Sequence, residues 1–482
     1  MISRLKTLML IFKTFSALIL LCGTGLAFGQ SGTPIPLDNL SSFKNPAKSW
    51  QIASAVKADI NTPNLLNVSN GIGILVNLPD KNNKGEDLIT VSEYGDIDLE
   101  FDYMMASGSN SGIYLQGRYE LQLEDTWGAK NPTSGNNGGI YERWDDSRPE
   151  GQKGYSGYAP RQNASRAPGL WQNLKISFRA PRFDDNGKKL ENAIMLRVEL
   201  NGVIIHDNVE LSGPTRGAIG NNEKARGPLR FQGDHGAVAF RNINITNYDT
   251  PRQAVKTATT SNGVDPILIN APVNTILRSF MDLPGGIRVV HAVSVGSSEQ
   301  VHYTYDMDNG MIIQLWRGGF LNATPMWHDR GDGSSRPIGT VQRFGKPALT
   351  LARLSSPQAA WLTDTAGSGY RPKGYILDDQ DRPMFRYLSY GLLVSDFTKA
   401  MENSRGISRE IKVQNPSKDL YFRLAEAAAI EEISSGMYMV DGQSYYLRLD
   451  DTGGSKPILR DINGRKELII PVGARLSYSI LF

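Results

Sequence analysis

Asp234 and His235 are the adjacent residues whose types best suit acid–base chemistry. They lie between two glycines in the stretch FQGDHGAVAFRNINIT, which begins at Phe231. An imidazole titrates near neutral pH, and a neighbouring carboxylate can orient it or raise its pKa. A histidine in a glycine-flanked turn is more often structural, with its ring hydrogen-bonded to a backbone carbonyl. The pair alone therefore leaves both interpretations open and favours the structural one.

A polar row in IYLQGRYELQLED is the second candidate site. Residues two apart on a strand share a face of the sheet, and this segment places on one face Arg118, Glu120, Gln122 and Glu124. If a sugar lies across that face, Glu120 or Glu124 is a candidate general acid or base, and Arg118 a candidate for positioning a hydroxyl or stabilising a carbonyl oxygen. A solvated sheet face with an Arg–Glu pair explains the pattern equally simply, and the pattern alone favours it.

Residues 126–170 form a long stretch without a strand period, and such loops are usually functional. The stretch is rich in glycine and charge and holds the aromatic residues Trp127, Tyr141, Trp144, Tyr155 and Tyr158. Aromatic rings with a polar edge stack well on sugars. They also serve as ordinary loop anchors, so this signal for carbohydrate is moderate.

Other chemistries are poorly encoded. Cys22 is the single cysteine, so a chain that has lost its N-terminal segment has no disulfide, thiolate nucleophile or cysteine-bound zinc or haem. There is no Ser-His-Asp pattern and no phosphate-binding loop, so no nucleotide is predicted. His206 with Asp207, and Asp184 with Asp185, lack the spacing of zinc or EF-hand sites.

The elements that must position these residues are strands. DIDLEFDYMM alternates, with Leu99, Phe101 and Tyr103 on one face. Asn201-Gly202, between two alternating runs, is the residue pair that a tight type I′ hairpin requires. Repeated strands separated by Gly, Asn and Pro turns predict an all-β fold, an antiparallel sandwich or jelly roll, from about Ser31 to Asn247.

The chain divides into four predicted parts. Residues 1–29 have a basic start, an apolar run and a small-residue cleavage pattern, which predicts a cleaved export signal and no membrane anchor after its removal. Residues 30–247 form the sandwich, 248–265 a polar linker, and 266–482 a second, mainly β accessory domain in which DLYFRLAEAAAIEEI is a candidate short helix. With a formal net charge of +3 and no long basic block, the chain gives no reason to predict nucleic-acid binding.

Five blocks that run in order from about Gly95 to Asn247 resemble the bacterial 3-keto-disaccharide hydrolase family, also described as a 3-keto-glucoside 1,2-lyase and 3-keto-2-hydroxy-glucal hydratase domain. They are GSNSGIYLQGRYELQLEDTWG, GIYERW, APRQNASRAPGLWQNLKISFRAPRFDDNGK, LNGVIIHDNVELSGPT and PLRFQGDHGAVAFRNINI. The resemblance implies a concanavalin-like jelly roll in an exported, periplasmic or extracellular protein. It also implies a glycoside substrate already oxidised at C3 by a separate sugar dehydrogenase, the expected pathway partner.

The resemblance further implies a mechanism. A C3 ketone acidifies the C2 hydrogen, so a base removes it, a cation or hydrogen-bond donors stabilise the enolate, the C1 group leaves, and water adds back. Within the family's motifs, His235 supported by Asp234 is the implied base or metal ligand, and Glu120 a second acid/base or metal ligand. The predicted substrate-binding residues are Arg118, Gln122, Gln232, Trp127, Tyr141 and Trp144. A divalent metal ion is a plausible cofactor. A non-catalytic carbohydrate-binding module and an envelope scaffold are the alternatives, because fold alone does not decide function.

Overall fold

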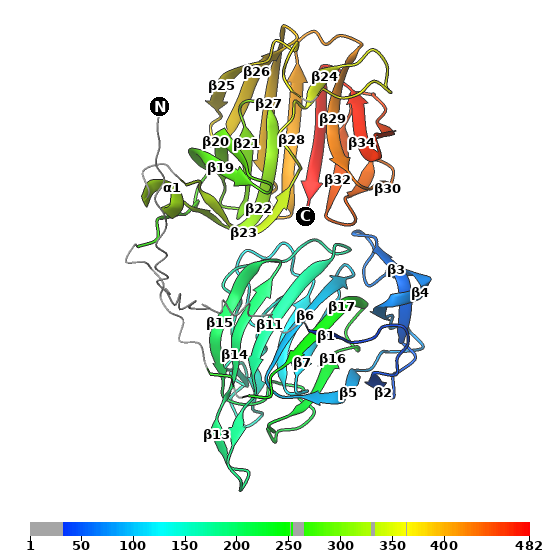
Figure 1. The fold of residues 1–482 in the computed structure, drawn as a ribbon, viewed down its shortest axis with the longest axis vertical. Helices are drawn as coiled ribbons and strands as arrows, with labels where there is room; N and C mark the ends of the chain where they lie inside the picture. Colours follow the sequence, from blue (N-terminus) through cyan, green and yellow to red (C-terminus); the bar gives the residue numbers. More distant parts are fainter. Residues whose placement is uncertain (1–31, 251, 254–264, 329–332, 363) are drawn as a thin grey trace, which may run out of the picture. The chain divides into compact units, whose positions relative to one another are not determined.

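Strands make up nearly all of the regular structure in the computed structural model of the chain (Figure 1), which describes residues 32–250, 252–253, 265–328, 333–362 and 364–482. Among these residues the one helix is α1 (Thr324–His328). The all-β prediction is confirmed. The predicted export signal, and residues 251 and 254–264 of the predicted linker, lie outside the described residues.

Two antiparallel sheets build the N-terminal half. The larger contains, in spatial order, β15 (Val203–Leu211), β14 (Ala193–Leu200), β11 (Gln172–Arg179), β6 (Ile97–Met105), β17 (Val238–Asn247), β4 (Leu66–Asn77) and β3 (Trp50–Ala58), with β1 (Thr33–Pro34) paired to β17. The smaller contains β2 (Phe43–Lys44), β5 (Leu88–Tyr94), β16 (Gly227–Phe231), β7 (Asn110–Leu115) and β8 (Tyr119–Glu124). Two short hairpins complete this half: β9 (Arg143–Trp144) with β10 (Gly154–Tyr155), and β12 (Arg182–Phe183) with β13 (Lys189–Glu191).

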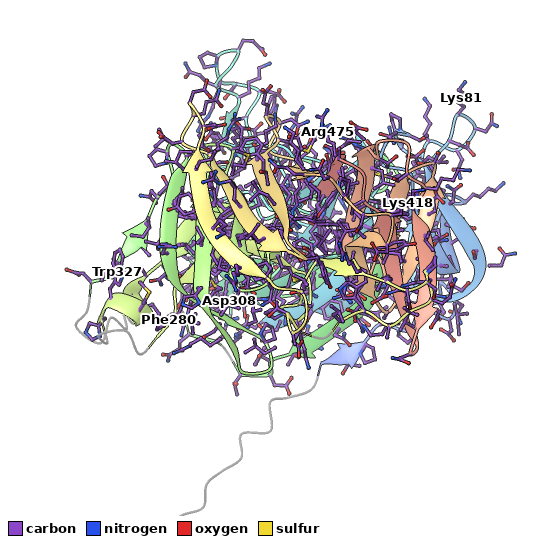
Figure 2. All side chains as sticks on the ribbon, turned by 90° about the horizontal axis from the view of Figure 1, so that it is seen from above. Lys81, Phe280, Asp308, Trp327, Lys418 and Arg475 are labelled. Atoms are coloured by element: carbon purple, nitrogen blue, oxygen red, sulfur yellow. The ribbon has the colours of Figure 1, made fainter. Side chains whose placement is uncertain are left out.

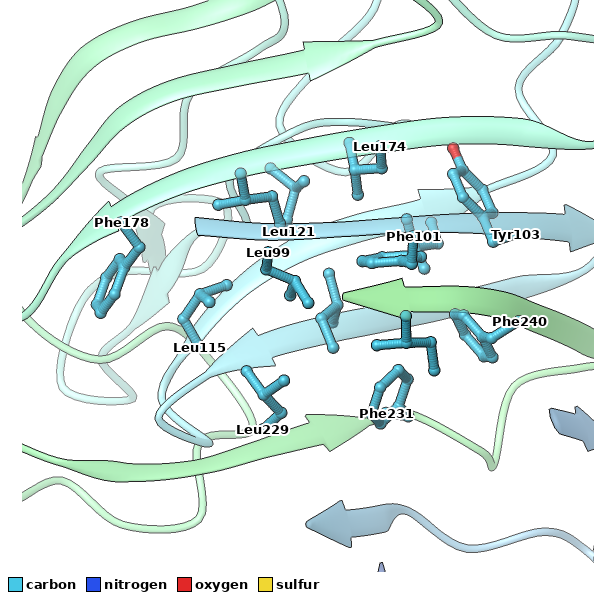
Figure 3. Close-up of a cluster of buried hydrophobic side chains, with 14 of the residues drawn as sticks. Leu99, Phe101, Tyr103, Leu115, Leu121, Leu174, Phe178, Leu229, Phe231 and Phe240 are labelled. Carbon is cyan, nitrogen blue, oxygen red and sulfur yellow. The ribbon is translucent and has the colours of Figure 1, made fainter. Parts of the chain in front are cut away.

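A single apolar core is shared by the two sheets, which makes this half a β-sandwich. Leu99 and Phe101 of β6 contribute from the larger sheet, and Leu121 of β8 and Phe231 of β16 from the smaller (Figure 3). The rings of Phe231 and Phe240 meet edge to face, with centroids 5.0 Å apart. Because strand side chains alternate between faces, filling this core fixes which residues of the smaller sheet point to its other face.

The predicted tight hairpin is present between β14 and β15. Asn201 and Gly202 have φ angles of 52° and 80°, the left-handed values that a type I′ turn demands and that asparagine and glycine tolerate best. The turn reverses the chain between the paired residues Leu200 and Val203.

Three further antiparallel sheets build the C-terminal half. The first contains β18 (Leu268–Ile269), β22 (Met311–Asn322), β21 (Val301–Asp306), β20 (Ile287–Gly296) and β19 (Thr275–Leu283), with β23 (Arg336–Arg343) paired to β22. The second contains β24 (Leu351–Arg353), β29 (Leu420–Ala427), β34 (Arg465–Pro471) and β33 (Ile458–Ile462). The third contains β25 (Arg371–Leu377), β26 (Pro383–Ser389), β27 (Leu392–Ala400), β28 (Gly406–Val413), β35 (Arg475–Leu481), β32 (Tyr445–Asp451), β31 (Met437–Val440) and β30 (Ile430–Ser434).

The prediction of a helix over DLYFRLAEAAAIEEI is wrong, because the segment forms β29 and β30. Alanine and glutamate favour helices, but Leu420, Phe422 and Leu424 alternate and fill the core of this half. Strand β29 also pairs on both sides, with β24 and with β34. Burial and pairing therefore override a weak local preference.

Residues 32–482 form one compact unit. Trp127 packs in an apolar cluster with Met437, Tyr446 and Leu481, and its Nε1 donates a 2.7 Å hydrogen bond to the Phe482 carbonyl oxygen. On the outside, side chains such as Lys81 and Trp327 extend from the ribbon (Figure 2). Within the described residues, no helix is both long and apolar enough to span a membrane.

Candidate functional site

A row of three polar side chains crosses the outer face of the smaller N-terminal sheet. Arg230 of β16 pairs with Tyr114 of β7, and Tyr114 pairs with Glu120 of β8. Their chain neighbours, among them Leu115 and Leu121, point into the sandwich core. The polar row is thus the part of the sheet that faces away from the core, as the alternation predicts.

Glu120 ends this row on the edge strand β8 and is almost completely buried, with 1% of its surface exposed. Neither carboxyl oxygen has a hydrogen bond of good geometry within the described part of the chain, although the Tyr114 hydroxyl lies close enough to interact with the carboxyl. Burial raises the pKa of this carboxyl to about 8, and the nearby Tyr114 hydroxyl and Arg230 guanidinium only partly oppose that rise. Glu120 is therefore mostly protonated at neutral pH and can donate a proton.

Gly112 gives the Glu120 carboxyl its room. A Cβ atom added at Gly112 would come within 2.4 Å of Glu120 Oε1, closer than carbon and oxygen can approach. Any other residue at position 112 would displace the carboxyl. The glycine in the NSGIY segment thus leaves the space that the Glu120 carboxyl of the neighbouring strand occupies.

Arg230 is the positive group of the row and is held rigidly. Its Nε lies 3.0 Å from Asp87 Oδ2, and its Nη1 donates to the Gly217 carbonyl oxygen at 2.6 Å. Its guanidinium carbon lies 3.7 Å from the centroid of the Tyr114 ring. A buried guanidinium fixed in this way is a preorganised electrostatic partner for negative charge that develops beside Glu120.

Two loops bond to the backbone of the edge strand β8. The hydroxyl of Thr215 accepts a 3.1 Å hydrogen bond from the Glu120 amide, and the Thr215 amide donates to the Arg118 carbonyl oxygen at 2.9 Å. The Tyr141 amide donates to the Glu120 carbonyl oxygen at 3.1 Å. The loop of Thr215 also lies against the row itself, where the Gly217 carbonyl oxygen accepts from Arg230 Nη1 at 2.6 Å, and this contact contributes to the burial of the row.

A second polar row lies next to the first. The Gln232 amide donates to the Gly112 carbonyl oxygen at 2.9 Å, and Gly112 pairs with Gln122. The Oε1 atoms of Gln122 and Gln232 are buried and lack a hydrogen-bond partner among the described residues. Unsatisfied buried polar atoms are uncommon in proteins, so a group of them beside Glu120 indicates the place of a polar ligand.

His235 and Asp234 lie in the turn that follows β16. The Nδ1 atom of His235 lies 2.5 Å from Asp234 Oδ1, and both side chains are about half exposed. Asp234 is near enough to Glu120 to contribute to the raised pKa of that carboxyl, after the larger effect of burial. The turn therefore adjoins the polar face, with its imidazole accessible.

A buried asparagine holds the backbone of this turn by hydrogen bonds. Asn77 Nδ2 donates to the carbonyl oxygens of Gly233 and Gly236 at 2.7 and 3.1 Å. The Gly233 amide donates to Asp87 Oδ1 at 3.1 Å, and the Asn110 amide to the His235 carbonyl oxygen at 3.3 Å. The backbone is fixed without the imidazole.

Two other histidines show what a structural imidazole does in this protein. Nε2 of His206 lies 2.7 Å from the Gly138 carbonyl oxygen, and Nε2 of His302 lies 3.0 Å from that of Gly318. Both rings are buried, and burial lowers the pKa of each to about 4. His235 differs from both, because its ring pairs with a carboxylate and faces solvent.

Three predicted site residues lie elsewhere or are already engaged. Arg118 donates from Nε to the Asn222 carbonyl oxygen at 2.7 Å and from Nη1 to that of Gln116 at 2.8 Å. The Arg216 guanidinium carbon lies 3.8 Å from the Trp144 ring centroid, which covers one ring face. Trp127 packs against the C-terminal strands, away from Glu120.

Tyr114 and Arg230 were missed by the sequence reasoning, although the sequence holds a signal for each. In GIYLQGRYEL, a three-residue turn over Gln116–Arg118 sets Tyr114 opposite Glu120. In PLRFQG, Leu229 and Phe231 are apolar, so Arg230 must share the other face with Gln232. Both residues follow from the sequence once β7 is paired with β8 and with β16.

Metal ligands do not converge in the described part of the chain, where no three His, Cys, Asp or Glu side chains group together. Asp87, the nearest carboxylate to Arg230, is paired with that guanidinium. The described donor set therefore does not fit a resident divalent ion.

A comparison with protein families matches residues 38–246 to the 3-keto-alpha-glucoside-1,2-lyase-like domain. The matched residues cover most of the N-terminal sandwich. Glu120, Arg230 and His235 all lie within the matched range. The match supports a carbohydrate-active enzyme of the glycosyl hydrolase type.

Solved structures similar to this chain include two candidate glycosyl hydrolases from Parabacteroides distasonis. One is 24% identical, with a TM-score of 0.31, and the similarity covers 45% of this chain and 84% of that one. The other is 18% identical, with a TM-score of 0.28, and the similarity covers 45% and 100%. The binding domain of botulinum neurotoxin serotype D is 8% identical, with coverage of 94% and 97% and a TM-score of 0.24. No curated protein matches the chain.

Proposed function

We propose that the 3-keto-alpha-glucoside-1,2-lyase-like domain cleaves 3-keto-glycosides by elimination followed by hydration. The observation that carries the proposal is Glu120, a buried carboxyl of raised pKa on a polar sheet face, with no ion pair to a described residue. Buried unpaired carboxyls with raised pKa values are typical of acid–base sites. Elimination needs such an acid, together with a base and a group that stabilises the enolate.

His235 is the proposed base. Its imidazole takes the acidic C2 proton of the 3-keto sugar, and the Asp234 carboxylate 2.5 Å from Nδ1 orients the ring. The electrons of the C2–H bond form the C2–C3 double bond of the enolate, and the C3 oxygen gains the negative charge. Arg230, held by Asp87 and Gly217, stabilises that charge.

Glu120 is the proposed acid. As the enolate collapses to the ketone, the C1–C2 double bond forms and the C1–O bond breaks with its electron pair on the leaving oxygen. The Glu120 carboxyl, protonated at neutral pH because burial raises its pKa to about 8, gives that oxygen its proton. The product is a 3-keto-2-hydroxy-glucal, and Gln122 and Gln232 offer unpaired amide oxygens to its hydroxyls.

Hydration reverses the proton movements. Glu120, now ionised, takes a proton from water as the water oxygen bonds to C1, and protonated His235 returns a proton to C2. The sum of the two stages is hydrolysis of the glycoside, with both groups restored. This differs from ordinary glycoside hydrolysis, which needs two carboxylates around an oxocarbenium-like transition state.

The test compares Glu120→Gln with Glu124→Gln. Both residues belong to β8 and to the same face, but Glu124 accepts a 3.1 Å hydrogen bond from Asn136 and is only partly buried. Purified variants are incubated with a 3-keto-glucoside, and aglycone and 2-hydroxy-glucal product are measured. We expect Glu120→Gln to lose about 10²- to 10⁴-fold in rate, and Glu124→Gln to stay near the wild type.

Three outcomes would overturn this function. Glu120→Gln could cleave at the wild-type rate, the wild type could leave 3-keto-glucosides intact while binding them, or it could cleave the unmodified disaccharide equally well. The second outcome would favour the carbohydrate-binding alternative. A parallel incubation with chelator tests the divalent metal expected from the family: since the described donor set does not fit an ion, we expect activity to persist.

We further propose, from the N-terminal sequence pattern, that the protein is exported and acts after a separate sugar 3-dehydrogenase. Oxidation of a C3 hydroxyl to a ketone is the reaction class that must supply such a substrate. N-terminal sequencing of the protein recovered from its native host, and cell fractionation, test the export. A mature chain that retains residues 1–29 inside the cell would contradict it.

A further inference from the structure

A cavity of about 650 Å³ lies in the C-terminal half, lined by strands β22, β28, β29, β34 and β35 and by the segment around Phe344. Its volume is within the range of small-molecule sites. The lining includes the buried residues Thr350 and Tyr478, while Lys346 and Arg465 are exposed. The cavity therefore has a closed interior and a charged, accessible margin.

A chain of alternating charges borders this cavity, and all its members except Arg460 line it. Arg460 Nε donates to Glu467 Oε2 at 2.8 Å, and Glu467 Oε1 accepts from Arg423 Nη1 at 2.8 Å. Arg423 also lies 2.8 Å from Glu426, and Arg465 Nε donates to Glu426 at 2.7 Å. Three arginines thus share two carboxylates, which leaves an excess of one positive charge among the described residues of this network.

The excess charge belongs to the exposed end of the chain. At the inner end, Arg460 Nη1 is tied to the carbonyl oxygens of Pro357 and Ala359, each at 2.7 Å. At the outer end, Arg465 is half exposed, and in the described residues only its Nε is engaged. Its two terminal nitrogens form the planar pair of donors that can bind a carboxylate in a bidentate manner.

Lys346 adds a second positive charge to the margin. It lines the cavity and forms no ion pair with a described residue. The other buried guanidinium of the lining, that of Arg409, is neutralised by Asp396 at 2.5 Å and carries no excess. The electrostatic balance of the cavity therefore favours an anionic ligand.

The remaining lining favours a ligand with hydroxyl groups and an apolar ring face. Phe344 and Tyr445 meet edge to face at 5.2 Å, which gives the cavity an aromatic wall. Asn463 and Thr350 supply neutral hydrogen-bonding groups. An aromatic wall, neutral polar groups, and a guanidinium whose two terminal nitrogens make no hydrogen bond to a described residue together match a sugar that carries a carboxylate.

We propose that this cavity is a second ligand site of the protein and binds a sugar acid, with the carboxylate on Arg465 and Lys346. The site shares no residue with the Glu120 face. It would let the protein bind an acidic carbohydrate independently of the cleavage reaction. The proposal does not depend on the proposed function of the N-terminal domain.

Isothermal titration calorimetry on the full chain tests the proposal, with glucuronate as the probe. Glucose tests the need for the carboxylate, and acetate and inorganic phosphate test the need for the sugar. We expect glucuronate to bind at least about tenfold more tightly than the other three, which corresponds to about 1.4 kcal/mol. Equal affinity for glucuronate and acetate, for glucuronate and phosphate, or no heat with glucuronate, would overturn it.

Arg475 offers a matched control for Arg465. Its Nε donates to Glu410 at 2.6 Å, it is exposed to the same extent as Arg465, at 54% against 53%, and it does not line the cavity. Figure 2 labels it. We expect Arg465→Gln to weaken glucuronate binding at least about tenfold and Arg475→Gln to leave it unchanged. Equal losses in both variants would contradict the site.

Two more variants keep the test decisive. Lys346→Gln removes the second charge without touching an ion pair, so it covers the case in which Arg465→Gln does not fold. Glu120→Gln should bind glucuronate like the wild type even where cleavage is lost. Loss of glucuronate binding in Glu120→Gln would place the ligand on the N-terminal face and overturn this proposal while leaving the proposed reaction standing.

Discussion

Glu120 and Asp396 are both buried carboxyl groups on antiparallel strands, with 1% and 0% of their surfaces exposed, yet their surroundings differ. Asp396 accepts from Arg409 Nε at 2.9 Å and from the Tyr305 hydroxyl at 2.9 Å. Glu120 has no ion pair with a described residue, and the nearby Tyr114 hydroxyl is its one side-chain hydrogen-bond neighbour among them. A buried charge with a full set of partners holds a fold together. A buried carboxyl without such partners is uncommon in proteins, and it indicates a place where a ligand supplies the missing contacts.

The Asp396→Asn variant tests the structural side of this contrast and should have the largest effect on stability. It leaves the Arg409 guanidinium buried without a counter-charge, so we expect a loss of about 3–5 kcal/mol in the free energy of unfolding. Urea denaturation at neutral pH measures it. The exposed pair of Lys57 and Glu431, 2.6 Å apart, is the control, and Glu431→Gln should change the stability by about 0–1 kcal/mol. Similar losses of stability in Asp396→Asn and Glu431→Gln would show that the buried ion pair contributes no more to stability than an exposed one.

Glu120→Gln tests the functional side of the contrast, and at high pH it should raise the free energy of unfolding, where Asp396→Asn lowers it. The folded pKa of Glu120, about 8, lies above the ordinary value of 4.5. Between these values the folded state keeps its proton while the unfolded state ionises, so the wild type loses stability as pH rises from 4.5 to 8. Glutamine does not titrate. The stability of Glu120→Gln relative to the wild type should therefore rise between pH 5 and pH 9, by on the order of a few kcal/mol.

The measurement is a series of denaturation curves of both proteins across that pH range. Glu124→Gln is again the control, because Glu124 is only partly buried and has a partner in Asn136. Its difference from the wild type should stay flat with pH. A flat difference for Glu120→Gln as well would mean that this carboxyl ionises as easily in the folded state as in the unfolded one, and the proposed acid would be lost.

Much of the arrangement behind this contrast was predictable from the sequence. Strict alternation in YELQLE placed Glu120 and Gln122 on the face opposite Leu121, and that assignment is correct. Alternation is local, so a short segment encodes it. The same rule would have placed Arg230, had its strand been paired with β7.

The burial of that face was not predictable in the same way. The polar pattern favoured a solvated surface, but the loops that carry Thr215 and Tyr141 bond to the backbone of β8, and the Thr215 loop also lies against the polar row. Such contacts join segments far apart in the chain and leave no periodic signal. The misassigned helix has the same origin: Leu420–Ala427 is a strand because β24 and β34 pair with it. Local patterns identify the elements, and long-range pairing decides which polar groups are buried.

The smallest expected change in stability is that of His235→Gln. Its side chain is about half exposed, its ring bonds to Asp234 alone among the described residues, and Asn77 holds the turn through the backbone. We expect the free energy of unfolding to change by no more than about 0.5 kcal/mol, while cleavage of a 3-keto-glucoside falls by about 10²-fold or more. His206→Gln is the matched control, because it removes a buried imidazole bound to a carbonyl oxygen. It should destabilise the fold, and its folded fraction should keep the wild-type rate. If His235→Gln cleaves at the wild-type rate, His235 is not the base, and the acid role of Glu120 would require a different base.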